Sequence, residues 1–190
     1  MRQEILIFEL GGRKPVLSGS VPGRMFFAKL TSAVERQEQP QALYLNFRGV
    51  QVVTGSFFRD GILAFRDHCL RERLNLYPVI ANVTTETLDE LKIALEVRGD
   101  AVVVCNLDAR SRVGGARVVG PLEEKQQVTL EAVVREQEAD ATTLRERYRE
   151  AEPIGVTGWN NRLAALAEKG LLMELKKGRG KVYRPVVEMG

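Results

Sequence analysis

Two hydrophobic periodicities alternate along the first 107 residues of this 190-residue chain, and this alternation constrains its fold most. Short apolar runs typical of strands are separated by longer segments in which apolar residues recur every three or four positions, as in amphipathic helices. The expected strands cover residues 3–10, 15–17, 42–47, 76–81 and 101–106, and the expected helices cover 22–37, 85–98 and a segment that begins near residue 56. Strands that alternate with helices predict an α/β fold with a largely parallel sheet.

The pattern changes after residue 107. Arginine, glycine and proline are frequent between residues 107 and 121, which is typical of a linker. Three helical segments follow, at 127–138, 142–150 and 157–169, and after them a two-stranded hairpin at 171–187 with a basic tip. We therefore expect a first domain at 1–107, a linker at 108–122 and a second domain at 123–190.

The net charge of +3 is unevenly distributed along the chain. Residues 141–190 hold ten Lys and Arg against six Asp and Glu, so the first 140 residues carry about −1. Within the last 22 residues the balance is six basic to two acidic side chains. A basic C-terminal part on a nearly neutral body indicates a polyanionic partner at that end.

Three short helices followed by a basic β-hairpin are the element order of a winged helix. The segment that carries this likeness is TGWNNRLAALAEKGLLMELKKGRGKVYRPV, residues 157–186. It resembles the winged helix-turn-helix transcriptional regulators, and the resemblance covers about the last 65 residues. It implies a partner, double-stranded DNA, whose major groove receives the third helix.

The predicted DNA-binding residues lie on the third helix and on the hairpin. Of the helix, we expect Trp159 or Asn160, together with leucines, to face inward, and Asn161 and Arg162 to face outward. Asparagine can contact adenine and arginine can contact guanine, and a threonine at the helix start suits a phosphate. The full set is Thr157, Asn160, Asn161 and Arg162 on the helix, and Lys176, Lys177, Arg179 and Lys181 on the hairpin. The alternatives are ordinary solvated side chains, or a winged helix that binds protein.

The N-terminal part resembles, more distantly, STAS-like domains of the anti-sigma-factor-antagonist type. The resemblance spans residues 15–105 and is carried by ALYLNFRGVQVVTGSFFRDGILAFRDHC, residues 42–69. In that family a serine at a helix-opening turn can be phosphorylated by a partner kinase. Ser56 falls on that position, while Thr54 replaces the family's Asp and Phe57 its Gly. The resemblance implies a sensing or docking domain, with Ser56 as the candidate phosphorylation site. The alternative is that Thr54 and Ser56 only cap the helix.

No arrangement of residues predicts an enzyme. The single histidine, His68, is adjacent to Cys69, and neighbouring helix positions point apart, so the two cannot form a nucleophilic pair. Cys69 and Cys105 predict neither a metal cluster nor a disulfide framework. We expect no cofactor and no metal. No apolar run approaches the roughly 20 residues that span a bilayer, and no signal peptide is evident, so we expect a cytoplasmic protein without a membrane partner.

The sequence thus predicts an α/β fold: an N-terminal STAS-like mixed sheet with helices, plus a C-terminal winged helix-turn-helix domain. The expected function is that of a DNA-binding transcriptional regulator whose N-terminal domain senses or docks a partner. The alternative function is a protein-interaction switch of the anti-sigma-factor-antagonist type, phosphorylated at Ser56 by a kinase. Many winged-helix regulators dimerise to read two half-sites, so a homodimer is possible. A strand edge near Pro78, taken to mark an edge or irregular strand, or the first C-terminal helix could supply its contact.

Overall fold

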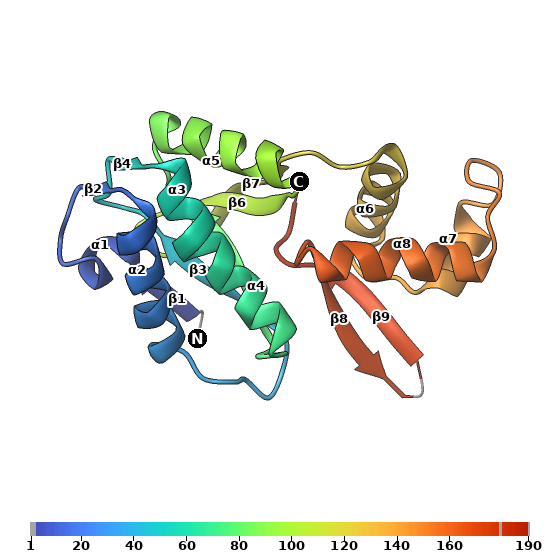
Figure 1. Ribbon diagram of the computed structural model, residues 1–190. Helices are drawn as coiled ribbons and strands as arrows, with labels where there is room; N and C mark the ends of the chain where they lie inside the picture. Colours follow the sequence, from blue (N-terminus) through green and yellow to red (C-terminus); the bar gives the residue numbers. More distant parts are fainter. Residues whose placement is uncertain (1–2, 179, 190) are drawn as a thin grey trace.

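The computed structural model describes residues 3–178 and 180–189 and has a mixed α/β fold (Figure 1). Its centre is a five-stranded sheet in the order β1-β3-β5-β6-β7. The first four of these strands are parallel, and β7 runs antiparallel to β6. The strands are β1 (Gln3–Leu6), β3 (Gln41–Asn46), β5 (Leu76–Ala81), β6 (Val102–Leu107) and β7 (Val113–Val119). Within the described ranges, no helix is both long and apolar enough to cross a membrane.

One face of the sheet is covered by the helices of the N-terminal part. These are α1 (Ile7–Leu10), α2 (Ser20–Ser32), α3 (Gly55–Phe57), the π-helix η1 (Phe58–Leu63), α4 (Ala64–Arg71) and α5 (Thr85–Arg98). A small parallel pair, β2 (Val16–Leu17) and β4 (Val52–Val53), lies beside them. Because successive side chains of a strand point to opposite faces, Leu43 and Leu45 of β3 enter this core while Tyr44 between them does not.

The opposite face of the sheet is covered by the C-terminal part. It consists of α6 (Glu124–Glu136), α7 (Ala141–Arg147), α8 (Val156–Glu168) and the antiparallel hairpin β8 (Leu172–Lys177) and β9 (Gly180–Pro185). A second core joins sheet residues such as Tyr44 and Val79 to Trp159 of α8 and Leu172 of β8. The C-terminal part therefore shares a continuous apolar core with the sheet.

The segment predicted as a linker, residues 108–122, contains strand β7 in its middle. The chain returns from β6 to β7 through a tight turn in which the Asp108 carboxylate accepts the N–H groups of Arg110 and Arg112, each at 2.8 Å. The glycines of β7 are exposed at the sheet edge, where no packing demands larger side chains. Because glycines are typical of loops, Gly114 and Gly115 led to the prediction of a linker where the structure has a strand.

Two strand expectations also need correction. Residues 3–10 were expected to be one strand, but β1 ends at Leu6 and a turn of helix begins at Ile7, which is buried. Pro78 was taken to mark an edge or an irregularity; β5 is a central strand between β3 and β6, so the edge alternative is wrong, and the irregularity is what the structure shows. Its ladder with β6 is paired only at Ile80 and Ala81, so the Pro78 end of β5 has no strand partner on that side.

A close contact between two glycines sets how α2 packs on η1. A Cβ atom added at Gly61 would lie 3.0 Å from the carbonyl oxygen of Gly23, and one added at Gly23 would lie 3.2 Å from the carbonyl oxygen of Phe57. The two backbones approach closely because neither glycine has a side chain. The π-helical turn lies at this contact, within a run that is helical from residue 55 to residue 71.

Candidate nucleic-acid interface

Helix α8 presents one apolar face and one polar face, as its sequence predicts. Trp159, Leu163 and Leu166 are buried in the core shared with the sheet. Thr157, Asn160 and Asn161 are exposed near the N-terminal end of the helix. Of the two alternatives for the inward position, Trp159 is therefore correct and Asn160 faces solvent.

The N-terminal end of α8 carries free backbone donors. Its N-cap is Gly155, and no side chain caps the helix there. The first N–H groups of a helix lack intrahelical partners and form a favourable place for an anion. Thr157 lies in this first turn, with its side chain exposed.

Arg162 does not extend outward as predicted. Its guanidinium donates to the Glu152 carboxylate at 2.7 Å and lies 5.7 Å from the centre of the Trp159 ring, and only 17% of its side chain is exposed. The chain before α8 brings Glu152 next to this arginine, which the helical pattern alone could not show. In this position Arg162 links the start of α8 to the segment that precedes it.

The hairpin divides its lysines between two faces. Lys176 and Lys181 are directly opposite each other, on the same face as Glu174 and Tyr183. Lys181 pairs with Glu174 at 2.9 Å, and Tyr183 donates to the other oxygen of that carboxylate at 3.3 Å. Burial, followed by the charge of Glu174, raises the pKa of Tyr183 to about 12, so the phenol remains protonated.

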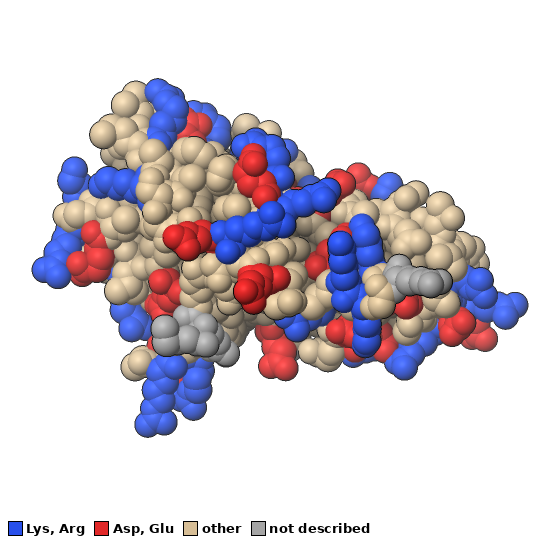
Figure 2. All heavy atoms as spheres, turned by 90° about the horizontal axis from the view of Figure 1, so that it is seen from below, with Lys and Arg blue, Asp and Glu red and all other residues tan. Residues whose placement is uncertain are grey.

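The other two predicted basic residues of the hairpin have different outcomes. Lys177 lies on the opposite face and pairs with Glu138 at 2.9 Å. Arg179 lies outside the described residues. Lysine pairs as exposed as these are readily exchanged for other partners, because solvent screens them. Figure 2 views the whole molecule from below and shows Lys and Arg interspersed with Asp and Glu over its lower surface.

A third chain segment joins the hairpin. Ala139 and Tyr183 exchange backbone hydrogen bonds of 2.9 and 2.8 Å, so the connection between α6 and α7 forms a short bridge beside β9. The resulting order is helix, bridge, helix, helix, strand, strand. The two hydrogen bonds of the bridge attach one edge of the hairpin to the segment that joins α6 and α7.

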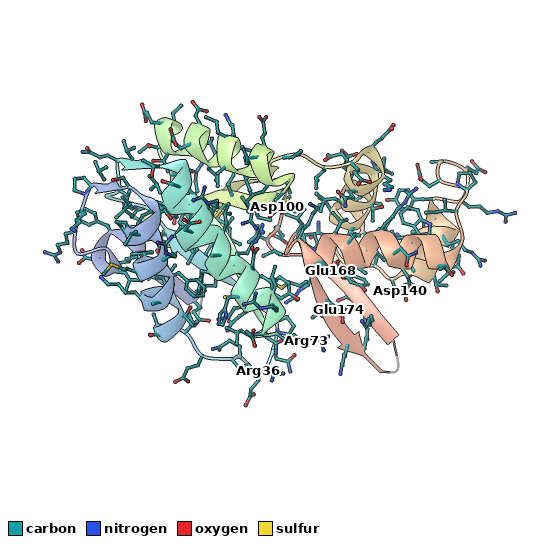
Figure 3. All side chains as sticks on the ribbon, viewed as in Figure 1. Arg36, Arg73, Asp100, Asp140, Glu168 and Glu174 are labelled. Carbon is teal, nitrogen blue, oxygen red and sulfur yellow. The ribbon has the colours of Figure 1, made fainter. Side chains whose placement is uncertain are left out.

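The C-terminal end of α8 is held against the sheet. Lys169 donates to the carbonyl of Gly99 at 3.1 Å and lies 3.8 Å from the Asp100 carboxylate. Figure 3 shows Asp100 at this junction, with Glu168 at the near end of α8. On the hairpin, the backbone N–H of Glu174 donates to the Tyr77 hydroxyl at 3.3 Å. These contacts orient α8 and the hairpin relative to the sheet.

Helix α7 and the turn that follows it add basic residues that the site prediction left out. Arg145 and Arg149 are exposed, and Arg147 is hydrogen-bonded to Glu136. In helix-turn-helix proteins the helix before the recognition helix crosses the DNA backbone. The run RERYRE at 145–150 contained this signal, but its alternating charges look like an ordinary solvated helix face.

Ser56 is half-buried at the start of α3. Its hydroxyl lies 3.2 Å from that of Thr54, whose oxygen also accepts the N–H of Gly19 at 3.2 Å. The side chain of Thr54 makes no capping hydrogen bond, and the N–H of Gly55 instead donates to the Glu90 carboxylate at 2.7 Å. A phosphate on Ser56 would meet this negative charge at the helix start. Phosphorylation of Ser56 stays a prediction.

The side chains of His68 and Cys69 pack against other residues of the N-terminal part. The His68 ring stacks edge-on against Phe27, with ring centres 5.7 Å apart. Cys69 is buried in the first core, and burial raises the pKa of its thiol to about 12. Such a thiol is protonated at neutral pH and is a poor nucleophile. Cys105 is also buried, in the second core, and neither cysteine forms a disulfide.

Comparison of the sequence with known proteins identifies no relative: no protein-family model matches the chain, and no curated protein matches it significantly.

Proposed function

We propose that this protein binds double-stranded DNA and acts as a transcriptional regulator. The proposed contact surface, called the α8–hairpin surface below, consists of Thr157, Asn160, Asn161, Lys176 and Lys181. The observation that carries the proposal is the exposure of the three polar α8 side chains on a helix whose other face is anchored in the core. A helix presented in this way fits the major groove of B-DNA.

Each residue of this surface has chemistry suited to one part of the duplex. Asn160 and Asn161 offer the donor and acceptor pair that matches the major-groove edge of adenine. Thr157 lies beside the free N–H groups at the start of α8 and suits a phosphate. Lys176 and Lys181 project from one face of the hairpin and suit the DNA backbone, where binding displaces counterions.

Selection of bound duplexes from a random oligonucleotide pool tests the proposal. We expect a preferred sequence to be enriched, and Asn161→Ala to relax the preference at one base position, at a cost of about 1–3 kcal/mol for the preferred site. Arg162→Ala serves as the matched control on the same helix, because its side chain is bound to Glu152 and should leave the base preference unchanged. Absence of enrichment, with duplex affinity weaker than about 10⁻⁴ M, would overturn the proposal.

A further inference from the structure

A cavity of about 600 Å³ lies where the sheet meets the C-terminal part. Its walls come from three segments distant in sequence: the start of β3, the connection after α6, and the base of the hairpin with the residues that follow it. This volume is within the range of small-molecule sites, which occur preferentially between structural units. A ligand here would contact both the sheet and the hairpin.

The cavity contains a cation available to a ligand. Arg184 projects from β9, where it is paired with Met173 of β8. Its one hydrogen bond within the described ranges runs to the Met173 sulfur at 3.8 Å, which is a weak acceptor. Among the described residues, no carboxylate forms an ion pair with it. The guanidinium can therefore receive a ligand carboxylate through two parallel hydrogen bonds.

The same cavity also offers acceptors. Gln41 uses its amide nitrogen for hydrogen bonds to Gln3 and Gln37, and Gln137 uses its own for the carbonyl of Val134. Within the described residues neither amide oxygen accepts a hydrogen bond, so both remain available as acceptors. Glu188 adds a carboxylate to the lining.

The backbone at Gln137, the C-cap of α6, has an unusual conformation in the wall of this cavity. Its φ of 63° lies in the left-handed region, although a non-glycine residue is strained there. Strain of this kind is concentrated at binding and switch positions. Gln137 also lies two residues before the Ala139–Tyr183 bridge, so it links the cavity wall directly to the hairpin.

We propose that this cavity binds a free α-amino acid with an apolar side chain, as the effector of the regulator proposed above, on which this inference rests. The carboxylate is bound by Arg184, and the ammonium by the amide oxygens of Gln41 and Gln137 together with Glu188. The ligand side chain packs on the apolar part of the lining, which consists of Ala42, Met173, Pro185, Val186 and Val187. Because Arg184 and Lys181 lie on the same strand, binding bears on the hairpin of the α8–hairpin surface.

Calorimetric titration of the full chain, without DNA, tests the binding site separately from DNA recognition. The probes are L-leucine and L-phenylalanine, with N-acetyl-L-leucine lacking the ammonium and L-leucinamide lacking the carboxylate. We expect at least one free amino acid to bind, and each modified leucine to bind at least tenfold more weakly than leucine. Absence of binding by both free amino acids at concentrations up to about 10 millimolar overturns the proposal, as does binding of the two modified forms as tightly as leucine itself.

Two cavity variants and one control variant make the test specific. Arg184→Gln is expected to weaken binding at least tenfold, whereas Arg117→Gln, which removes an exposed arginine from a different groove between β7 and α6, leaves it unchanged. Gln137→Gly relieves the backbone strain and should weaken binding while the fold is retained, so loss of binding cannot be ascribed to unfolding. Equal affinities for the wild type and both cavity variants overturn the proposal. If the protein binds the amino acid but has no affinity for DNA, the binding site stands and only its role as an effector site is overturned.

Discussion

Arg66 is buried although it is charged, and its partners explain why. The guanidinium donates to the carbonyl of Ala101 at 3.0 Å, to the Asp67 carboxylate at 2.6 Å, and to Asp100. Burial alone would lower the pKa of Arg66, but the hydrogen bond and charge of Asp100, with those of Asp67, raise it above its usual value. The arginine thus stays ionised between α4 and the start of β6.

Replacing Arg66 by Ala would leave Asp100 buried without its main partner. We expect Arg66→Ala to lower the free energy of unfolding by about 3–5 kcal/mol, as for other broken buried pairs. Arg71→Ala, on the same helix, removes an exposed arginine paired with Glu72 and should change stability little. Urea unfolding of the two variants measures the difference. Equal decreases in the free energy of unfolding would show that the buried Arg66 contributes no more to stability than an exposed arginine.

Asp60 gives the stability a dependence on acidic pH. Hydrogen bonds from Arg59 and Ser20 lower the pKa of its carboxyl to about 2 from the usual 3.8. Because the folded state favours the ionised form, the stabilisation is present above pH 4 or so and is lost as the pH falls from there toward 2. Asp60→Asn should therefore be less stable than the wild type at pH 6, and the difference should shrink at pH 3. Urea unfolding at both pH values measures it; a difference independent of pH would contradict the assignment.

At the scale of elements, the Gly23–Gly61 contact decides how closely α2 packs on η1. Gly61→Ala places a methyl group 3.0 Å from a backbone oxygen that cannot rotate away. We expect a loss of about 1–3 kcal/mol in thermal or urea unfolding, typical of overpacking. Gly114→Ala in β7 is the control, since an added Cβ there meets nothing within 4 Å. Equal stability of the Gly61 and Gly114 variants would show that the helices can separate without cost.

The elements most visible in the sequence were those with a long, regular apolar pattern. Buried strands such as β6 and the apolar face of α8 followed from residue spacing alone. The elements that were missed depend on partners far away in the sequence. β7 is a strand because β6 lies beside it, and the helix at Ile7 forms because that side chain is drawn into the core. Periodicity within one segment contains no information about such partners.

The site prediction was limited in the same way. Exposure of Asn161 follows from the helical period. The position of Arg162 instead depends on Glu152, which the non-helical segment before α8 places next to it. The cavity with Arg184 could not have been predicted, because its walls come from three separate segments. Likewise, pairing of Lys177 with Glu138 is decided by which face of the hairpin each residue occupies.

At the scale of the whole molecule, the C-terminal part is an integral layer of the fold. The core around Trp159 includes residues of the sheet, and Lys169 and Glu174 add polar contacts across the same junction. The proposed recognition helix is therefore oriented by the sheet. Under the proposed function, a ligand that alters this junction would also alter the orientation of α8.

The affinity for a duplex measured as a function of salt tests the proposed DNA contact at this scale. Each lysine that neutralises a phosphate contributes about one unit to the slope of log affinity against log salt concentration. We expect the double variant Lys176→Ala, Lys181→Ala to bind all duplexes more weakly and to reduce the slope by about two. Arg71→Ala with Lys92→Ala, on α4 and α5, removes the same charge elsewhere and should retain the wild-type slope. Identical slopes for the two double variants would show that DNA, if bound, does not contact the hairpin.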